Sequence, residues 1–346
     1  MNKIVVDPSI RIIYSSFYIR GLEDLYGKRN VCFSAKYFSD LCREVGPDSY
    51  DQYMPFVLLN GSDINRFIID FRDKPSIDCR AYEWCDVYAK INYNKNITPD
   101  FYKDKIISIT PSFGIKIWNF RETIYFLISN LFKCKFALLV PLDQYIKDYL
   151  FQYFKCLRVE EYYNIPSSKS NSYVFFISTL WGHENCVNGT NFFRKQFIEV
   201  CSKNKSIMFE GGLYSNSLHS QYVDFKDFIY SKKYSRVTYV QNSILSLFVF
   251  NVPSVHDCHG WKLGEFLAMG KAIISMPLSN SLPCDLIHGE NIHLVSNIEE
   301  IDEAVLLLLN DKKYRMRLAD GARRYYMKYA SPKSVIESIV DSVPNP

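Results

Sequence analysis

Short apolar runs alternate with stretches of helical periodicity along most of this 346-residue chain. Such alternation is typical of β-α-β units, in which helices join parallel strands, and it favours the α/β class. In the first half, the apolar runs predict strands at residues 10–14, 31–33, 56–59, 68–70, 87–91, 106–109 and 136–140. Helical spacing predicts helices at residues 17–26, 36–44, 121–131 and 142–157.

A polar stretch at residues 166–172 interrupts this pattern, which then restarts. The second half predicts strands at residues 173–178, 206–209, 247–250, 272–276 and 291–295. It predicts helices at residues 189–203, 237–246, 262–269, 298–310, 313–329 and 334–342. We therefore expect three parts: an N-terminal domain over 1–165, a second domain over 173–330, and a C-terminal helix and tail over 331–346. Two consecutive α/β domains favour a ligand cleft between them.

Composition excludes several classes of protein. An apolar fraction of 48% and a charged fraction of 23% describe a globular chain. The net charge of +4 is shared evenly by the two halves, which argues against nucleic acid as a partner. The ten cysteines form no C-x-x-C pair, so no zinc site is expected and a reducing compartment is indicated. No apolar run reaches the roughly 18–20 residues of a membrane span. We expect a cytoplasmic protein, with peripheral contact at the inner face of the membrane left open.

Residues 252–278 form the segment that predicts a ligand site. They follow a buried strand, cross a polar loop and enter a helix near Gly260 and Trp261. The start of a helix at the carboxyl end of a parallel strand offers free N–H groups to a phosphate. Lys262 and Glu265 share one face of the first turn, and Gly264 could allow close approach of a ligand. An ordinary helix entry is the alternative interpretation.

This segment resembles the donor-binding segment of GT-B glycosyltransferases, especially the group-one superfamily. In that family two acidic residues separated by seven others precede the pattern A-x-G-x-P/A-I-I, and here Asp257-x7-Glu265 leads into Gly270-Lys-Ala-Ile-Ile. Lys262 is similar to the basic residue that serves the phosphates in exostosin-type transferases. The resemblance implies two Rossmann-like domains with parallel sheets facing a cleft. It also implies a nucleotide-sugar co-substrate, with no further cofactor or metal, and assigns Glu265 to the ribose and Asp257 to the donor sugar.

Other residues could extend the donor site. His256 and His259 flank Asp257 and could contact phosphate or sugar, bind metal, or simply pack within the loop. Thr179 follows the first strand of the second domain and should face the same ligand edge. Glu210 and Gly211 are expected where the next strand ends, either against substrate or in a simple turn.

The first domain should carry the acceptor site and any general base. It contains no histidine, so an inverting enzyme would need a carboxylate. Asp70 and Asp73 directly follow an apolar strand and are the candidates, with solvated loop charges as the alternative. Tyr14 and Ser15, at the end of the expected strand 10–14, could touch the acceptor, or Ser15 could cap a helix. A retaining enzyme needs no such base, because the departing phosphate can take the proton, and the Asp257–Glu265 spacing favours retention.

The expected reaction moves a hexose-like unit from a nucleotide-diphosphate sugar to a hydroxyl of a glycan or lipid-linked acceptor, as in surface polysaccharide synthesis. Two alternatives stay open at this point. A nucleotide-sugar epimerase or hydrolase of the same fold would convert the donor without an acceptor. A non-catalytic glycan-binding protein would bind a glycan and ignore nucleotides.

Overall fold

The chain divides into two units, each with its own core. The computed structural model describes residues 2–41, 43, 53–135, 137–163, 172–216 and 218–343. The first unit comprises Met1–Val159, Asn280–Cys284 and Lys328–Pro346, and the second comprises Glu160–Ser279 and Asp285–Met327. The boundary expected at residues 166–172 lies, apart from Ser172, outside the described residues. The segment expected as a separate tail, 331–346, belongs instead to the first unit.

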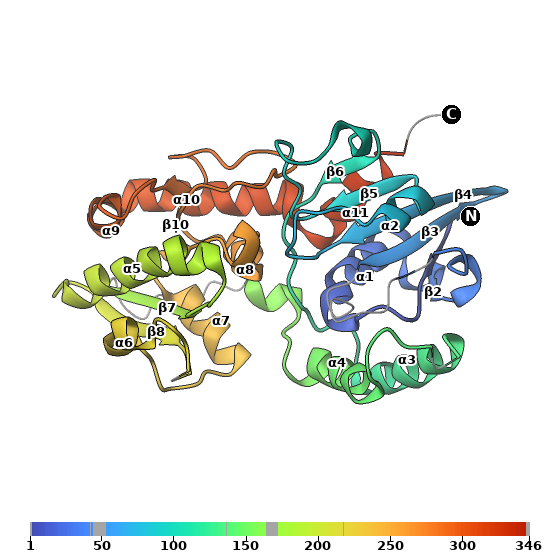
Figure 1. Cartoon of the computed structure of the whole chain (residues 1–346), viewed down its shortest axis with the longest axis horizontal. Coiled ribbons are helices and arrows are strands. Elements are labelled where there is room, and N and C mark those ends of the chain that lie inside the picture. Colours follow the sequence, from blue (N-terminus) through green and yellow to red (C-terminus); the bar gives the residue numbers. More distant parts are fainter. Residues whose placement is uncertain are drawn as a thin grey trace. The chain divides into compact units, whose positions relative to one another are not determined.

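A six-stranded sheet forms the centre of the first unit (Figure 1), in the order β2-β1-β3-β4-β5-β6. Its strands are β1 (Lys3–Val6), β2 (Val31–Phe33), β3 (Met54–Asn60), β4 (Asp63–Asp70), β5 (Val87–Lys90) and β6 (Ile106–Ser108). The pairs β1–β2, β4–β5 and β5–β6 are parallel, as the α/β pattern predicts. Five of these strands lie close to predicted apolar runs, whereas β1 was not predicted.

The sheet is mixed rather than parallel throughout, because β3 and β4 form an antiparallel hairpin. Asn60 pairs with Asp63 across a two-residue loop, in which Gly61 has a φ of +63° that suits glycine. β1 also pairs antiparallel with β3. The sequence Asn60-Gly61-Ser62-Asp63 is a hairpin signal that the helix-and-strand alternation obscures.

The helices of the first unit are α1 (Ile12–Tyr26), α2 (Cys79–Trp84), α3 (Phe120–Lys133), α4 (Leu142–Phe154) and α11 (Pro332–Val340). The strand expected at residues 10–14 is wrong, since α1 begins at Ile12 and buries Ile12, Ile19 and Leu22 on one face. α11 packs against α1 at Gly21, where a Cβ would lie 2.1 Å from the carbonyl oxygen of Pro332. Gly21 therefore permits the close approach of these two helices.

Two further predictions for the first unit do not hold over the described residues. Residues 137–140 are not a strand, and residue 136 lies outside the described part of the chain. The helix expected at residues 36–44 is reduced to a short 3₁₀ turn, Ala35–Tyr37, in which Ser34 accepts a hydrogen bond from the N–H of Lys36. Residues 42 and 44 of that prediction are outside the described ranges.

The second unit contains only parallel strand pairs among its described strands. β7 (Tyr173–Thr179) pairs with β8 (Met208–Tyr214), and β10 (Ile273–Ser275) lies between β9 (Val249–Asn251) and β11 (His293–Leu294). A common core joins the two sets of strands, because Phe176 of β7 and Phe250 of β9 pack together with Phe197. Burial of these large rings is the dominant stabilising term of such a core.

Helices accompany these strands, and all but the short α6, which was not predicted, lie at nearly the predicted positions. They are α5 (Asn191–Lys203), α6 (Tyr222–Phe225), α7 (Arg236–Leu245), α8 (Trp261–Met269), α9 (Glu300–Asn310) and α10 (Lys312–Tyr325). Among the described residues, no helix has both the length and the apolar character needed to cross a membrane. The second unit thus confirms the α/β pattern with parallel strands.

Candidate functional site

Helix α8 begins at the predicted place, directly after the loop that follows β9. Gly260 is its N-cap residue with extended backbone, and no side chain caps the first turn. Gly270 ends the helix in the left-handed conformation, with a φ of +61°. Arg323 donates hydrogen bonds to the carbonyl oxygens of Ala268 and Met269 in the last turn. The carboxyl end of α8 is therefore closed by protein groups, and the amino end is open to a ligand.

A cavity of about 310 Å³ lies at the carboxyl ends of β7, β8 and β9, beside the start of α8. All of its lining residues belong to the second unit. They are Ile177, Ser178, Thr179, Trp181, Arg194, Tyr214, Tyr239, Asn251, Val252, Ser254, Gly260, Trp261 and Lys262. Ligands of open parallel sheets bind at this edge. The structure thus brings the predicted residues Thr179, Gly260, Trp261 and Lys262 together around one cavity.

Two cationic side chains reach this cavity from different helices. Lys262 Nζ donates a hydrogen bond to the carbonyl oxygen of Ile177. Arg194 of α5 is buried and donates to the carbonyl oxygens of Thr179 at 3.1 Å and Pro253 at 3.3 Å. Burial and, to a smaller extent, the neighbouring charge of Arg194 together lower the pKa of Lys262 to about 7, against an opposing contribution from Glu265. Burial also lowers the pKa of Arg194.

Neither cation forms an ion pair with a carboxylate of the described residues. Glu265, three residues beyond Lys262, forms its ion pair with Arg236 instead. Besides the two carbonyls, Arg194 donates at 2.9 Å to the neutral amide oxygen of Asn191. Buried charge is costly unless a counter-charge compensates it. The cavity therefore carries positive charge that a bound anion would neutralise.

Glu265 lies about one turn beyond Lys262 in α8 and is buried, so it does not line the cavity. Its Oε1 accepts from Nη2 of Arg236 in an ion pair, and from the hydroxyl of Tyr162 at 3.4 Å. The guanidinium of Arg236 also lies 5.3 Å from the ring centre of Trp261, which is part of the cavity wall. Glu265 thus positions Arg236 against a lining residue.

The loop between β9 and α8 is held in an unusual backbone conformation. His256 and Asp257 have φ values of +56° and +54°, which non-glycine residues adopt at an energetic cost. Asn185 fixes the loop from outside, since its Nδ2 donates to the carbonyl oxygen of Ser254 at 2.9 Å and to Asp257 Oδ1 at 2.8 Å. The rings of His256 and His183 meet edge to face with centres 4.2 Å apart. The loop therefore presents an exposed Asp257 next to Ser254, a lining residue.

The remaining predicted donor residues lie away from the cavity. His259 and Gly264 are buried and do not line it. Glu210 and Gly211 were expected at the carboxyl end of their strand, but β8 continues to Tyr214, and Glu210 pairs with Phe175 in the first half of β7. Glu210 accepts hydrogen bonds from the hydroxyls of Tyr173 at 2.7 Å and Tyr234.

Gly211 is a strand residue rather than a turn residue. A Cβ at this position would lie 1.8 Å from the carbonyl oxygen of Phe176 on the paired strand. Gly211 therefore permits the close packing of the two strands inside the unit. The strand end that was expected at Gly211 is wrong.

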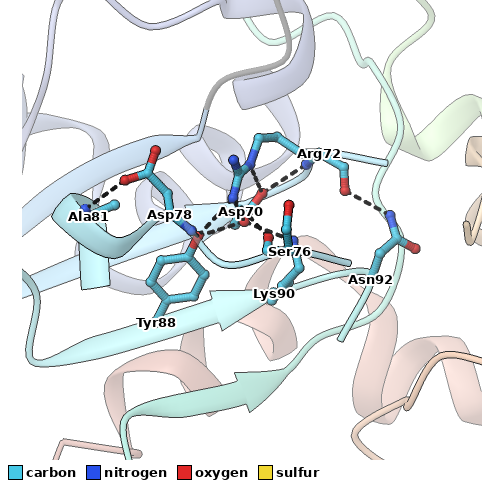
Figure 2. A network of polar contacts seen from close by, with 8 residues as sticks. All are labelled: Asp70, Arg72, Ser76, Asp78, Ala81, Tyr88, Lys90 and Asn92. Carbon is cyan, nitrogen blue, oxygen red and sulfur yellow. Dashed lines mark hydrogen bonds and ion pairs between the residues drawn. The ribbon is translucent and has the colours of Figure 1, made fainter. Parts of the chain in front are cut away.

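Asp70 ends β4 in the first unit and is fully buried. Figure 2 shows that its carboxylate is surrounded by donors from β5 and from the loop after β4. It accepts from Arg72 Nη2 at 2.7 Å, from the hydroxyl of Tyr88 at 2.6 Å and from Lys90 Nζ at 2.8 Å. Burial opposes ionisation, but the charges of Lys90 and Arg72 overcome it and hold the pKa of Asp70 well below its usual range.

A carboxylate with these partners is a poor general base, because the neighbouring cations oppose its protonation. The geometry therefore argues against the predicted catalytic role of Asp70. Asp73 is exposed in the loop that follows.

The predicted acceptor-side residues belong to α1 rather than to a strand end. Tyr14 stacks on Phe71 with ring centres 5.4 Å apart, and Ser15 is fully buried within the helix. The helix starts at Ile12 with Arg11 as its N-cap residue, so Ser15 is also not a cap. Both residues belong to the first unit, whereas the cavity is lined by the second.

Two functional candidates were missed from the sequence, Arg194 and Arg236. Arg194 shares the buried face of α5 with Asn191, Phe197, Ile198 and Cys201. A cation on the apolar face of a predicted helix is a usable signal for a buried charge. Arg236 opens α7 and offers no comparable pattern, since its contacts come from distant segments.

Comparison with protein-family models gives no match, and neither does comparison with curated proteins. Solved structures similar to the chain include TarM, at 13% identity and a TM-score of 0.40, with 84% of this chain and 64% of TarM aligned. The pneumococcal O-GlcNAc transferase GtfA aligns at 12% identity and a TM-score of 0.39, over 84% of this chain and 64% of GtfA.

The C-terminal domain of the group 1 glycosyl transferase LpcC from Francisella tularensis aligns at 14% identity and a TM-score of 0.37. That alignment covers 49% of this chain and 96% of the domain. The chain thus spans less than two thirds of TarM and of GtfA. At these identities and TM-scores, the similar structures do not assign a function to the chain.

Proposed function

We propose that the chain is a glycosyltransferase that binds a nucleotide-diphosphate sugar in the cavity of the second unit. One observation carries this proposal: Lys262 and Arg194 bring positive charge, without an ion-paired carboxylate among the described residues, to the open amino end of α8. A diphosphate fits that arrangement better than a neutral ligand, because backbone N–H groups, the helix dipole and both cations favour negative charge.

The same groups would lower the barrier of glycosyl transfer. When the bond between the anomeric carbon and the diphosphate oxygen breaks, negative charge grows on the diphosphate. Lys262, Arg194 and the N–H groups at the start of α8 would stabilise that charge. We therefore propose a transferase that needs no metal ion for this step.

The acceptor hydroxyl would form the new bond to the anomeric carbon, and its proton would pass to the departing diphosphate. This route requires no protein carboxylate as base, and it agrees with the position of Asp70 inside an ion-pair network. We accordingly favour retention of configuration. The acceptor proposed from the sequence is a glycan or a lipid-linked sugar.

The nucleoside would extend from the diphosphate toward the aromatic wall of the cavity. Trp181, Tyr214, Tyr239 and Trp261 line it, and such rings stack well on bases and sugars. Glu265 remains our candidate for the ribose hydroxyls. It would reach them through a change in its ion pair with Arg236, since its side chain is buried.

A thermal-shift panel of UDP, GDP, CMP and their sugar conjugates, with EDTA present, tests the proposal. A nucleotide at about 100 times its dissociation constant should add about 2.7 kcal/mol of apparent stability. Lys262→Met should abolish the shift. Lys271→Met is the matched control, because Lys271 is also partly buried, donates to backbone carbonyls and has a pKa lowered by burial to about 8, but does not line the cavity.

Transfer assays complete the test. Release of free nucleoside diphosphate only when an acceptor is added would support the transferase, and loss of activity in EDTA restored by manganese would reject the metal-free step. Conversion of the donor without acceptor would favour the epimerase or hydrolase instead. Absence of any nucleotide shift would reject the donor site.

A further inference from the structure

The face of the first unit formed by α3 and α4 exposes more apolar surface than its own core requires. On α3, Tyr125, Ile128 and Phe132 are 62%, 48% and 64% exposed. Their spacing of three and four residues places them in one stripe of the helix. The opposite side of α3 already supplies the core, where Phe126 stacks on Trp118 with ring centres 4.3 Å apart.

A second exposed stripe runs along α4 through Phe151 and Phe154. α4 packs against α3 and α1, and Figure 1 shows α3 and α4 in the outer layer of the first unit, with α1 between them and the sheet. The exposed rings of the two helices meet, since the ring centre of Phe120 lies 6.4 Å from that of Phe154. We call the surface of Tyr125, Ile128, Phe132, Phe151 and Phe154 the α3/α4 face.

The segment that builds this face carries a net positive charge, although the two halves of the chain share the net charge evenly. Residues 116–158 carry seven Lys and Arg against three Asp and Glu, which equals the net charge of +4 of the whole chain, so the remainder is balanced at 34 of each. The cations are Lys116, Arg121, Lys133, Lys135, Lys147, Lys155 and Arg158.

The acidic residues of the segment are already engaged. Asp148 is buried against Arg11, and Glu122 and Asp143 accept from Lys28 and Lys147. Asp143 therefore offsets Lys147, whereas Asp148 and Glu122 pair with cations from outside the segment, so the segment keeps its net positive charge.

We propose that the α3/α4 face docks on an anionic lipid surface. Exposed aromatic and aliphatic side chains insert at the boundary of head groups and acyl chains, and the surrounding cations are attracted to acidic lipids. Protein–protein interfaces share the aromatic residues but are depleted in lysine. The lysines of residues 116–158 therefore favour a lipid surface over a protein partner. The inference is independent of the proposed donor site, because it concerns only the first unit.

Vesicle co-sedimentation of the full chain tests this assignment. The protein should bind phosphatidylcholine vesicles that contain about one third phosphatidylglycerol, and bind pure phosphatidylcholine much more weakly. Raising the salt from about 0.1 M to about 1 M shortens the Debye length from about 10 Å to about 3 Å and should release much of the bound protein. Equal binding to both kinds of vesicle, or no binding to the anionic ones, would overturn the proposal.

The variant Tyr125→Ser/Phe132→Ser/Phe154→Ser should bind anionic vesicles at least about tenfold more weakly, since three inserted rings are lost. The control variant Ile97→Ser/Phe101→Ser removes apolar residues that are equally exposed in the same unit, but beside the ion pair Asp100–Lys103, and should bind like wild type. An unchanged melting curve and nucleotide response show that each variant is folded.

Two further outcomes complete the design. Arg121→Gln/Lys133→Gln should weaken binding about fivefold per removed cation and reduce its salt dependence. Light scattering addresses the competing occupant: a dimer in solution that the triple serine variant dissociates would assign the α3/α4 face to a second copy of the chain and reject the membrane assignment.

Discussion

Each unit has a lysine amine near the carboxyl end of a parallel strand, and the two amines differ in what surrounds them. In the first unit, Lys90 donates to Asp70 at 2.8 Å, and both side chains are fully buried. In the second unit, Lys262 donates to the carbonyl oxygen of Ile177, and its nearest cationic neighbour is Arg194. The first lysine is ion-paired with a carboxylate. Among the described residues the second donates to a backbone carbonyl and forms no ion pair, and Glu265 acts on it only through space.

The surroundings of Lys90 are typical of a network that stabilises the fold, and those of Lys262 are typical of a site that binds an anion. Asp70, Lys90 and Arg72 satisfy one another, so a ligand would gain little by entering. Lys262 and Arg194 repel each other and bear the cost of burial without an ion-paired carboxylate among the described residues. An anion that binds there recovers this cost, which is the physical basis for placing the donor in the second unit. Four changes test the contrast.

Asp70→Asn should have the largest effect and should act on stability. The change leaves Lys90 and Arg72 buried without their counter-charge, which costs about 3–5 kcal/mol for a broken buried pair. Denaturant unfolding measures this loss, with exposed Asp73→Asn as the control. Nucleotide binding to the folded fraction should stay normal. A stable Asp70→Asn protein that binds donor but does not transfer would instead restore Asp70 as a catalytic base.

Arg194→Met should act on binding instead. A charged hydrogen bond contributes about 1.5–3 kcal/mol, so affinity for the nucleoside diphosphate should fall about 10- to 100-fold in calorimetric titration. The ligand-free protein should lose little stability, because an unfavourably buried charge is removed together with its hydrogen bonds. Arg315→Met is the control, since Arg315 donates to the carbonyl oxygens of Leu308 and Leu309 and does not line the cavity. Equal losses in both variants would reduce Arg194 to a structural role.

The contrast between the units also shows what the sequence can predict. Most of the strands and α8 were predicted because burial imposes a local pattern, an apolar run followed by a helical repeat that ends at Gly270. The cavity residues from the segment 252–278 followed from the same pattern. The partners of Asp70 were not predictable, because Tyr88 and Lys90 reach it only through the parallel register of β4 and β5. Glu210 was misplaced for a similar reason, since the length of β8 is fixed by its pairing with β7.

Glu265→Gln should have a smaller effect that is specific to the ribose. Glutamine keeps the shape and an acceptor for Arg236 and Tyr162, so a stability loss of about 1–2 kcal/mol is expected. If Glu265 accepts ribose hydroxyls, wild type should prefer a ribonucleoside diphosphate over its 2′-deoxy analogue by about tenfold, and the variant should bind both alike. A preference that survives in Glu265→Gln would confine the residue to positioning Arg236.

The last test concerns protons, and it distinguishes the two partly buried lysines of the second unit, Lys262 and Lys271. Burial lowers the pKa of Lys262 from 10.5 to about 7, so between these pH values the unfolded chain holds a proton that the folded unit lacks. The ligand-free protein should therefore gain stability as pH rises through this window, by at most about 1.4 kcal/mol per pH unit for one proton. Lys271, with its pKa lowered to about 8, adds a slope of the same sign.

Diphosphate binding distinguishes the contribution of Lys262 from that of Lys271. A diphosphate favours the charged form of Lys262, so binding at about pH 8 should take up a proton, and affinity should fall as pH rises above about 7. Calorimetry in buffers of different ionisation enthalpy measures that uptake. Lys262→Met should abolish it and Lys271→Met should preserve it, because Lys271 does not line the cavity. If the proton uptake persists in Lys262→Met, another group accepts the proton. Lys262 is then not the residue that attracts the diphosphate to the second unit.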